Sequence, residues 1–152
     1  MKKLYAYIMV GVLIFGHFDS AFCAEKGTSE EAIAMVKKAI AEIKQKGLET
    51  TIEEVNDRNG KFVDRDLYVM IYTMTGKNLA HGANPRMVGK DLIDIKDQNG
   101  VYFIRERLEI AKTKGTGWQD YSFVNPVSKK IEPKSLYIEK YGDVVITCGV
   151  YK

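Results

Sequence analysis

The sequence has few of the residues from which disulfides and metal sites are built. Its 152 residues include two cysteines and two histidines. One of each, Cys23 and His17, lies near the start, which leaves Cys148 and His81 for the rest of the chain. One cysteine cannot close an internal disulfide, and one distant His–Cys pair does not make a zinc site. A Gly-rich phosphate loop and a haem-attachment motif are also missing. We therefore expect no metal and no cofactor, and a buried, inert thiol at Cys148, which lies in the apolar run "DVVITCGVY".

An excess of one charge is also missing. The chain has 23 basic and 20 acidic residues, mixed along its length, and no basic stripe is visible. Proteins that bind nucleic acid concentrate Lys and Arg on one face. We therefore expect no nucleic-acid partner. Beyond the first two dozen residues, no apolar run reaches membrane-spanning length.

The N-terminus has the layout of a secretory signal peptide. Lys2 and Lys3 precede the apolar run "LYAYIMVGVLIF", and "DSAFCA" comes next with small residues. We expect residues 1–24 to be this signal and residues 25–152 to be a single periplasmic or secreted domain. Phe22 is unfavourable three positions before such a cut, so an uncleaved membrane anchor stays open as the alternative. Loss of the first 24 residues leaves 21 basic and 19 acidic residues, a net charge of +2.

Two helices are predicted at the start of the domain. Thr28 and Glu31 have capping-box spacing, and Ile33, Val36, Ile40 and Ile43 repeat at helical spacing. Gly47 is typical of a helix end, so the first helix covers residues 28–47. A shorter helix is expected over residues 48–56.

Most of the remaining chain is predicted to form strands. "DLYVMIYTMTGKNLAH" predicts a hairpin that turns at "TGKN", and residues 82–100 predict a loop with a turn or two of helix. "VYFIRERLEIAKTKG" predicts a second amphipathic helix. Three strand candidates close the chain, at residues 117–124, 133–141 and 143–151. This order predicts an α+β domain with the first helix packed on an antiparallel sheet of about five strands.

Several motifs in one order carry a family resemblance. They are "TGKNLAHGANPRMVGKDLIDIKDQNG", "GTGWQDYSFVNP", "IEPKSLYIEKYGD" and "CGVYK". Together they resemble a single Cache domain of the type 2 group, over nearly the whole chain after residue 24. The resemblance implies a PAS-like fold, with a ligand pocket on the sheet face away from the first helix.

The resemblance also implies an extracytoplasmic sensor that binds a small carboxylate or a similar compact polar molecule. Members usually belong to chemoreceptors, histidine kinases or cyclases and often dimerise through the first helix. This sequence ends at Lys152 without a second span. We therefore expect a ligand-binding domain without its own output module, which acts through a separate membrane receptor or kinase or as a homodimer. A protein-binding accessory subunit of a receptor complex is the alternative. No nucleophile elbow or acid–base pair stands out, so we expect that the protein is not an enzyme.

The candidate ligand contacts are a lysine and a set of aromatic residues. A carboxylate needs a cation or hydrogen-bond donors and a shaped apolar wall. Lys134 in "EPKSLY" is the first candidate for pairing with the anion. Tyr121 and Trp118 lie three apart, so a regular strand puts them on opposite faces. We expect Tyr121 to donate a hydrogen bond and Trp118 to form a wall or lid, unless both pack in the core.

Strand parity adds more candidates. Tyr68, Met70 and Tyr72 alternate with aliphatic residues. Tyr137 alternates with Leu136 and Ile138 in the same way. If the aliphatic residues of both strands face the first helix, Tyr68, Met70, Tyr72 and Tyr137 all face the pocket side.

His81 closes the hairpin. It either donates to a ligand or orders the loop that comes after it. Arg105, on the second helix, is a candidate for a charge in the site, but a position on the solvated face of the helix is the favoured interpretation. Asp94, Asp97 and Asn99 lack the spacing of a calcium loop.

Overall fold

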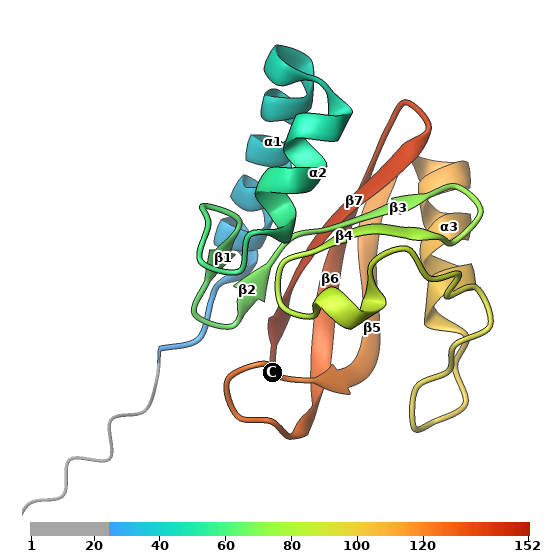
Figure 1. The fold of residues 1–152 in the computed structure, drawn as a ribbon. Helices are drawn as coiled ribbons and strands as arrows, with labels where there is room; N and C mark the ends of the chain where they lie inside the picture. The colour runs from blue at the N-terminus through green and yellow to red at the C-terminus, as the bar shows by residue number, and fades with distance from the viewer. Residues whose placement is uncertain (1–24) are drawn as a thin grey trace, which may run out of the picture.

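The computed structural model describes residues 25–152, which form a five-stranded antiparallel sheet with helices on both faces (Figure 1). The sheet has the order β4-β3-β7-β6-β5. Its strands are β3 (Met70–Thr73), β4 (Asn78–His81), β5 (Thr116–Val124), β6 (Ile131–Tyr141) and β7 (Val144–Tyr151). The predicted signal peptide, residues 1–24, lies outside the described residues. In the described part of the chain, no helix is both long enough and apolar enough to cross a membrane.

The two N-terminal helices form where the sequence predicts them. In α1 (Ser29–Lys46), Thr28 and Glu31 make both hydrogen bonds of the capping box. Gly47, with φ 86°, ends this helix and leads directly into α2 (Leu48–Asn56). Helix α1 packs on β7 and β6 through its buried residues, namely Ala32, Val36, Ala39 and Ile40. Burial of this stripe stabilises the helix more than its intrinsic propensity does.

The predicted hairpin is present, but its first arm is divided. β2 (Leu67–Tyr68) pairs with β1 (Val63–Asp64) in a small separate sheet. The chain then enters the main sheet at Met70, and β3 pairs with both β4 and β7. Arg65, with φ 54°, makes the turn between β1 and β2. The division places Tyr68 at the end of the main sheet, close to the last residues of β7.

The long loop and α3 (Phe103–Lys114) cover the sheet face opposite α1 (Figure 1). The loop includes one short 3₁₀ turn, η1 (Pro85–Met87), as expected for residues 82–100. Backbone hydrogen bonds tie it to the hairpin: the N–H of Asn78 donates to the carbonyl of Lys90, and that of Gly89 donates to the carbonyl of Asn78.

The two faces of the sheet belong to two apolar clusters. The α1 side holds Leu67, Val69, Ile71, Tyr137, Val144, Ile146 and Cys148. The α3 side holds Tyr68, Met70, Tyr72, Phe103, Ile104, Leu108, Tyr121, Leu136, Ile138 and Tyr151. Alternate residues of each strand therefore serve different cores. Cys148 is buried as expected, and burial raises the pKa of its thiol to about 12, so little thiolate forms at neutral pH.

Candidate functional site

The α3 side of the sheet holds two basic side chains without an acidic partner. Lys134 and Arg107 are both 0% exposed. All three guanidinium nitrogens of Arg107 lack a hydrogen-bond partner. The ion pairs found among residues 25–152 all involve other side chains. Charged side chains are almost never fully buried without a partner, because desolvation of a charge costs several kcal/mol. The arrangement therefore fits an anion with several acceptor oxygens.

Sheet register places Lys134 in the middle of this site. Its neighbours across the sheet are Tyr121 on β5 and Tyr151 on β7. Also on β7, Gly149 provides room for the lysine side chain. A Cβ atom at Gly149 would lie 2.8 Å from Cε of Lys134 and 2.6 Å from the carbonyl oxygen of Ser135. A glycine is therefore needed at this position for Lys134 to lie flat along the sheet.

Aromatic rings surround the ammonium group of Lys134. Its Nζ lies 3.8 Å from the ring centre of Tyr68 and 4.5 Å from that of Tyr151. It donates one long hydrogen bond, 3.4 Å, to the Tyr151 hydroxyl. Ring faces attract a cation, but they replace only part of its hydration. Burial therefore lowers the pKa of Lys134 to about 7, and the charge of Arg107 acts in the same direction.

Arg107 reaches the site from α3. It shares the buried helix face with Phe103, Ile104, Leu108 and Ala111. Its guanidinium carbon lies 5.0 Å from the Tyr72 ring centre and 5.3 Å from that of Tyr121. Sequence reasoning missed this residue and weighed Arg105, which is exposed and pairs with Asp94. The missed signal is the spacing: Phe103, Arg107 and Ala111 lie four apart on the apolar stripe.

The tyrosine hydroxyls form a short chain beside Lys134. The hydroxyls of Tyr68 and Tyr151 lie 3.0 Å apart, and Tyr151 donates to the carbonyl of Val124 at 2.8 Å. Tyr72 donates to the sulfur of Met70. Tyr121 stacks on Phe103 with ring centres 4.8 Å apart, and burial raises its pKa to about 12. The Tyr121 phenol is therefore neutral at physiological pH and able to donate a hydrogen bond.

His81 both orders the loop and contacts the site. Its Nδ1 accepts hydrogen bonds from the N–H groups of Ala83 and Asn84, as the loop-ordering alternative predicts. The ring also stacks on Tyr68, with centres 5.1 Å apart. Burial lowers the His81 pKa to about 3, and the charges of Lys134 and Arg107 add to this effect. The imidazole is therefore neutral, and because Nδ1 is an acceptor, Nε2 carries the proton.

The prediction that Tyr137 faces the pocket side is wrong, and Trp118 is on the same opposite face. Tyr137 belongs to the α1-side cluster, and its hydroxyl donates to Glu139. Trp118 is its partner across β5 and β6, with ring centres 5.3 Å apart, and is 40% exposed. Trp118 and Tyr121 do lie on opposite faces, as their spacing predicts. The Tyr137 prediction assumed that Leu136 and Ile138 of β6 face the first helix, but these two residues face α3.

The other candidates lie together on the α3 side. Tyr68, Met70, Tyr72 and Tyr121 all belong to this cluster, and Lys134 and His81 contact Tyr68. The parity prediction for the first strand was therefore correct.

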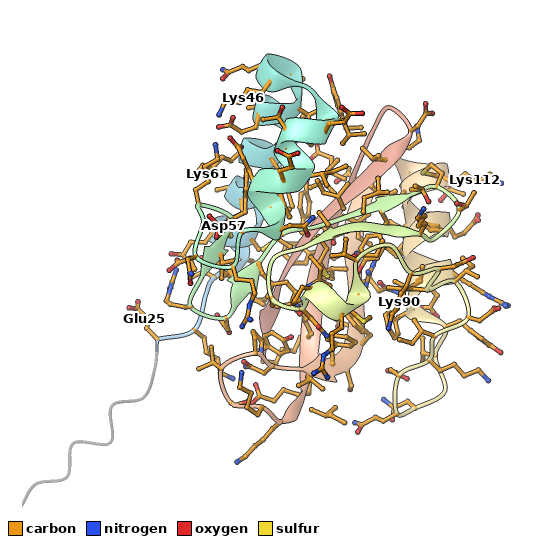
Figure 2. The ribbon with its side chains drawn as sticks, viewed as in Figure 1. Glu25, Lys46, Asp57, Lys61, Lys90 and Lys112 are labelled. Carbon is orange, nitrogen blue, oxygen red and sulfur yellow. The ribbon has the colours of Figure 1, made fainter. Side chains whose placement is uncertain are left out.

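Two other kinds of site were considered among residues 25–152, namely a metal site and a surface hollow. No group of three or more His, Cys, Asp or Glu side chains in this range could hold a metal ion. A surface hollow of about 240 Å³ is lined by Glu54, Asp57, Gly60 and Lys61. It lies on the side of α1 and α2, where Figure 2 labels Asp57 and Lys61, and shares no residue with the buried cations. The site on the α3 side remains the candidate.

An antiparallel sheet with a long helix on one face and a second helix and loop on the other is the architecture of the PAS-like class. The profile of the family described as Single Cache domain 2 matches residues 2–152. The chain belongs to this family, and the resemblance noted in the sequence is confirmed.

Known structures and proteins agree with the family. A methyl-accepting chemotaxis protein from Vibrio parahaemolyticus is 28% identical, with a TM-score of 0.69 over 80% of this chain and 86% of that one. A Cache chemosensory domain described for carboxylic acid recognition shares the fold at 21% identity, with a TM-score of 0.67 over 81% of this chain and 92% of that one. The chemotaxis receptor McpP of Pseudomonas putida is 30% identical over 90 residues, which are 58% of this chain and 16% of the receptor. This chain therefore matches only a small part of that receptor's length.

Proposed function

We propose that this Cache domain is an extracytoplasmic sensor module that binds a small carboxylate between the sheet and α3. The single observation that carries the proposal is the pair of fully buried basic side chains, Lys134 and Arg107, that lack an acidic partner. A carboxylate offers two oxygens and about four acceptor positions, which matches a planar guanidinium and an ammonium group.

Each side chain has a role in this proposal. Arg107 pairs with the carboxylate through its unpartnered N–H groups, and Lys134 contacts an oxygen from the sheet side. The phenols of Tyr68, Tyr72 and Tyr121 line the site and supply hydrogen bonds. The recognition of carboxylic acids by another Cache chemosensory domain supports this ligand class.

The surroundings favour a compact ligand. Phe103, Leu136 and Ile138 belong to the same cluster as the tyrosines, so apolar side chains bound the site on several sides. A short apolar chain on the carboxylate would replace water against these walls. Signalling through a separate membrane receptor or kinase is part of the proposal, and chemotaxis receptors are the relatives that support it.

The test is a thermal-shift screen of the purified protein against acetate, propionate, pyruvate and lactate, with acetamide as the uncharged control. Binding to the native state raises the unfolding free energy by RT ln(1 + [L]/Kd), about 2.7 kcal/mol at a hundredfold excess over Kd. We expect the midpoint to rise with at least one carboxylate and not with acetamide. Equal midpoints with every compound, at concentrations up to tens of millimolar, would contradict the proposal and favour the accessory-subunit alternative.

A matched pair of variants assigns the site. Arg107→Met removes the buried guanidinium, and Arg105→Met removes an exposed guanidinium from the same helix. The carboxylate shift should disappear in the first variant and persist in the second. A shift that persists in both would place the ligand elsewhere.

A further inference from the structure

Lys134 is enclosed by side chains from several elements, and none of them is a carboxylate in contact with its ammonium group. Tyr121 lies on β5, Tyr151 on β7 and Tyr68 on β2, while the thiol of Cys148, also on β7, lies on the opposite, α1 side of the sheet. Arg107 approaches from α3, and His81, from β4, stacks on the ring of Tyr68. Asp66, from the turn before β2, is the acidic neighbour. It makes no ion pair with Lys134, and its Oδ1 accepts the N–H of Gly27 at 2.7 Å.

The groups around Lys134 do not exchange protons near neutral pH. Burial raises the pKa of the Tyr68, Tyr121 and Tyr151 phenols, and that of the Cys148 thiol, above the ordinary value. His81 is held neutral by burial and by its two backbone donors. Lys134 is therefore the group in this set whose protonation changes around pH 7.

Two features of the unliganded site disfavour the charged form of Lys134. Its ammonium group has lost water to aromatic rings and one 3.4 Å hydrogen bond. The guanidinium of Arg107 shares the same enclosure and disfavours a second positive charge there. A carboxylate that enters this enclosure reduces both effects, because it supplies a hydrogen-bond acceptor to Lys134 and offsets the charge of Arg107.

We propose that the site takes its anionic ligand together with a proton, and that Lys134 is the residue that accepts this proton as the anion enters. The inference rests on the proposed carboxylate function. In the resting site Lys134 is largely neutral above pH 7. In the filled site it is an ammonium ion in contact with a carboxylate oxygen. The sensor therefore responds to the product of anion and proton activities and answers a given carboxylate concentration more strongly in acidic surroundings.

The expected pH dependence follows from linkage. The ligand raises the pKa of Lys134, so one proton is taken up per anion between the unliganded and the liganded pKa values. The apparent Kd for acetate should rise about tenfold between pH 8 and 9, and about twofold between pH 6 and 7. Free acetate stays ionised over this whole range, so its own protonation does not contribute.

Two measurements test the inference. The first is isothermal titration calorimetry of acetate into the full protein at pH 8, in two buffers with different ionisation enthalpies. A difference in heat that corresponds to about one proton taken up per acetate supports the proposal. The second is an NMR titration of protein labelled with ¹³C at lysine Cε, without ligand and with saturating acetate. The Lys134 signal, assigned by its loss in Lys134→Met, should titrate near neutral pH without ligand and well above it with acetate.

Lys134→Arg is the control that keeps the charge and removes the titration. Its acetate affinity should be flat between pH 6 and 9. If acetate binds the wild type with no proton uptake, or Lys134 titrates at its ordinary value without ligand, the inference is overturned and the carboxylate function stands. If acetate, propionate, pyruvate and lactate all fail to bind, while Lys134 still titrates near neutral pH, the carboxylate function is overturned and the inference with it.

Discussion

Lys134 and Tyr68 are in direct contact: the lysine Nζ lies 3.8 Å from the centre of the tyrosine ring. Lys134 is on β6 of the main sheet, and Tyr68 is on β2, which pairs with β1 outside that sheet. The contact closes the end of the site where β2 leads into β3. It also explains why a fully buried lysine is tolerated, because the ring face supplies part of the attraction that water would give.

Loss of the Arg107 guanidinium should weaken ligand binding without lowering the stability of the unliganded protein. Arg107→Met should weaken carboxylate binding at least tenfold, since a charge-assisted hydrogen bond contributes about 1.5–3 kcal/mol. The unliganded protein should unfold at the same or a higher temperature, because a buried charge without a partner is removed. Calorimetric titration and thermal denaturation give the two quantities. A strongly destabilised Arg107→Met with normal binding would show that Arg107 is structural.

Stability without ligand should rise with pH above neutrality. The folded pKa of Lys134, about 7, lies below its unfolded value, so the unfolded chain binds more protons between pH 7 and about 10. The free energy of unfolding therefore increases over this window. Lys134→Met should flatten the increase and be the more stable protein at pH 6. Urea denaturation at pH 6, 8 and 9.5 measures this, and identical pH profiles for the two proteins would contradict it.

His81 should contribute to loss of stability in acid. Its folded pKa, about 3, lies below the unfolded value, so the unfolded chain takes up a proton that the native ring rejects. This part of the stability is present above about pH 6.5 and declines as pH falls toward 3. His81→Asn keeps a side-chain acceptor for the N–H groups of Ala83 and Asn84 and does not titrate. Its denaturation midpoint should depend less on pH between 6.5 and 4 than that of the wild type.

A methyl group at Gly149 should disturb both the sheet and the site. The added Cβ would meet Lys134 and the carbonyl oxygen of Ser135 at distances too short for contact. Overpacking of this kind costs about 1–3 kcal/mol. Gly149→Ala should therefore lower the unfolding free energy and weaken carboxylate binding, as measured by denaturation and calorimetry. Gly89→Ala is the control for lost stability without a clash: Gly89 has φ 81° and no heavy atom within 4 Å of an added Cβ, so the variant strains only the loop backbone and should bind normally.

The two sheet faces should respond differently to mutation. Tyr121→Phe removes a hydroxyl from the α3 side and should lower carboxylate affinity severalfold, about 0.5–1.5 kcal/mol for one hydrogen bond. Tyr137→Phe and Trp118→Ala change the α1 side and should leave affinity within about twofold. Affinities from one calorimetric series decide this. A large loss of binding in Trp118→Ala would place the ligand on the α1 side.

Helices and strand positions were largely readable from the sequence. Helix α1 begins and ends within one residue of the prediction, which rested on the capping pair Thr28 and Glu31 and on Gly47 at the C-terminal end. Local rules suffice there, because a helix cap and a turn depend on residues a few positions apart. The division of residues 67–73 into β2 and β3 was not predicted, since it depends on pairing with β1 and β7.

The location of the site was only partly determined by the sequence. Lys134 and Tyr121 were chosen as ligand contacts from their residue types and the motifs, and the structure places them on the α3 side with the tyrosines of the first strand, for which parity predicted the face. Tyr137 was placed on the wrong face, because helices cover both sides of this sheet and both faces are therefore apolar. Alternation shows which residues share a face, but it does not show which face meets which helix.

Local sequence thus determined the elements and the alternating pattern of the strands. The tertiary structure decided which alternation faces α3, and it alone brought Arg107 beside Tyr72 and Tyr121. The physical reason is that the spacing of Arg107 on the apolar stripe of α3 indicates a buried face but does not show which side chains that face meets. Only the packing of α3 against the sheet removes water from Arg107 and encloses it with a second basic side chain, Lys134.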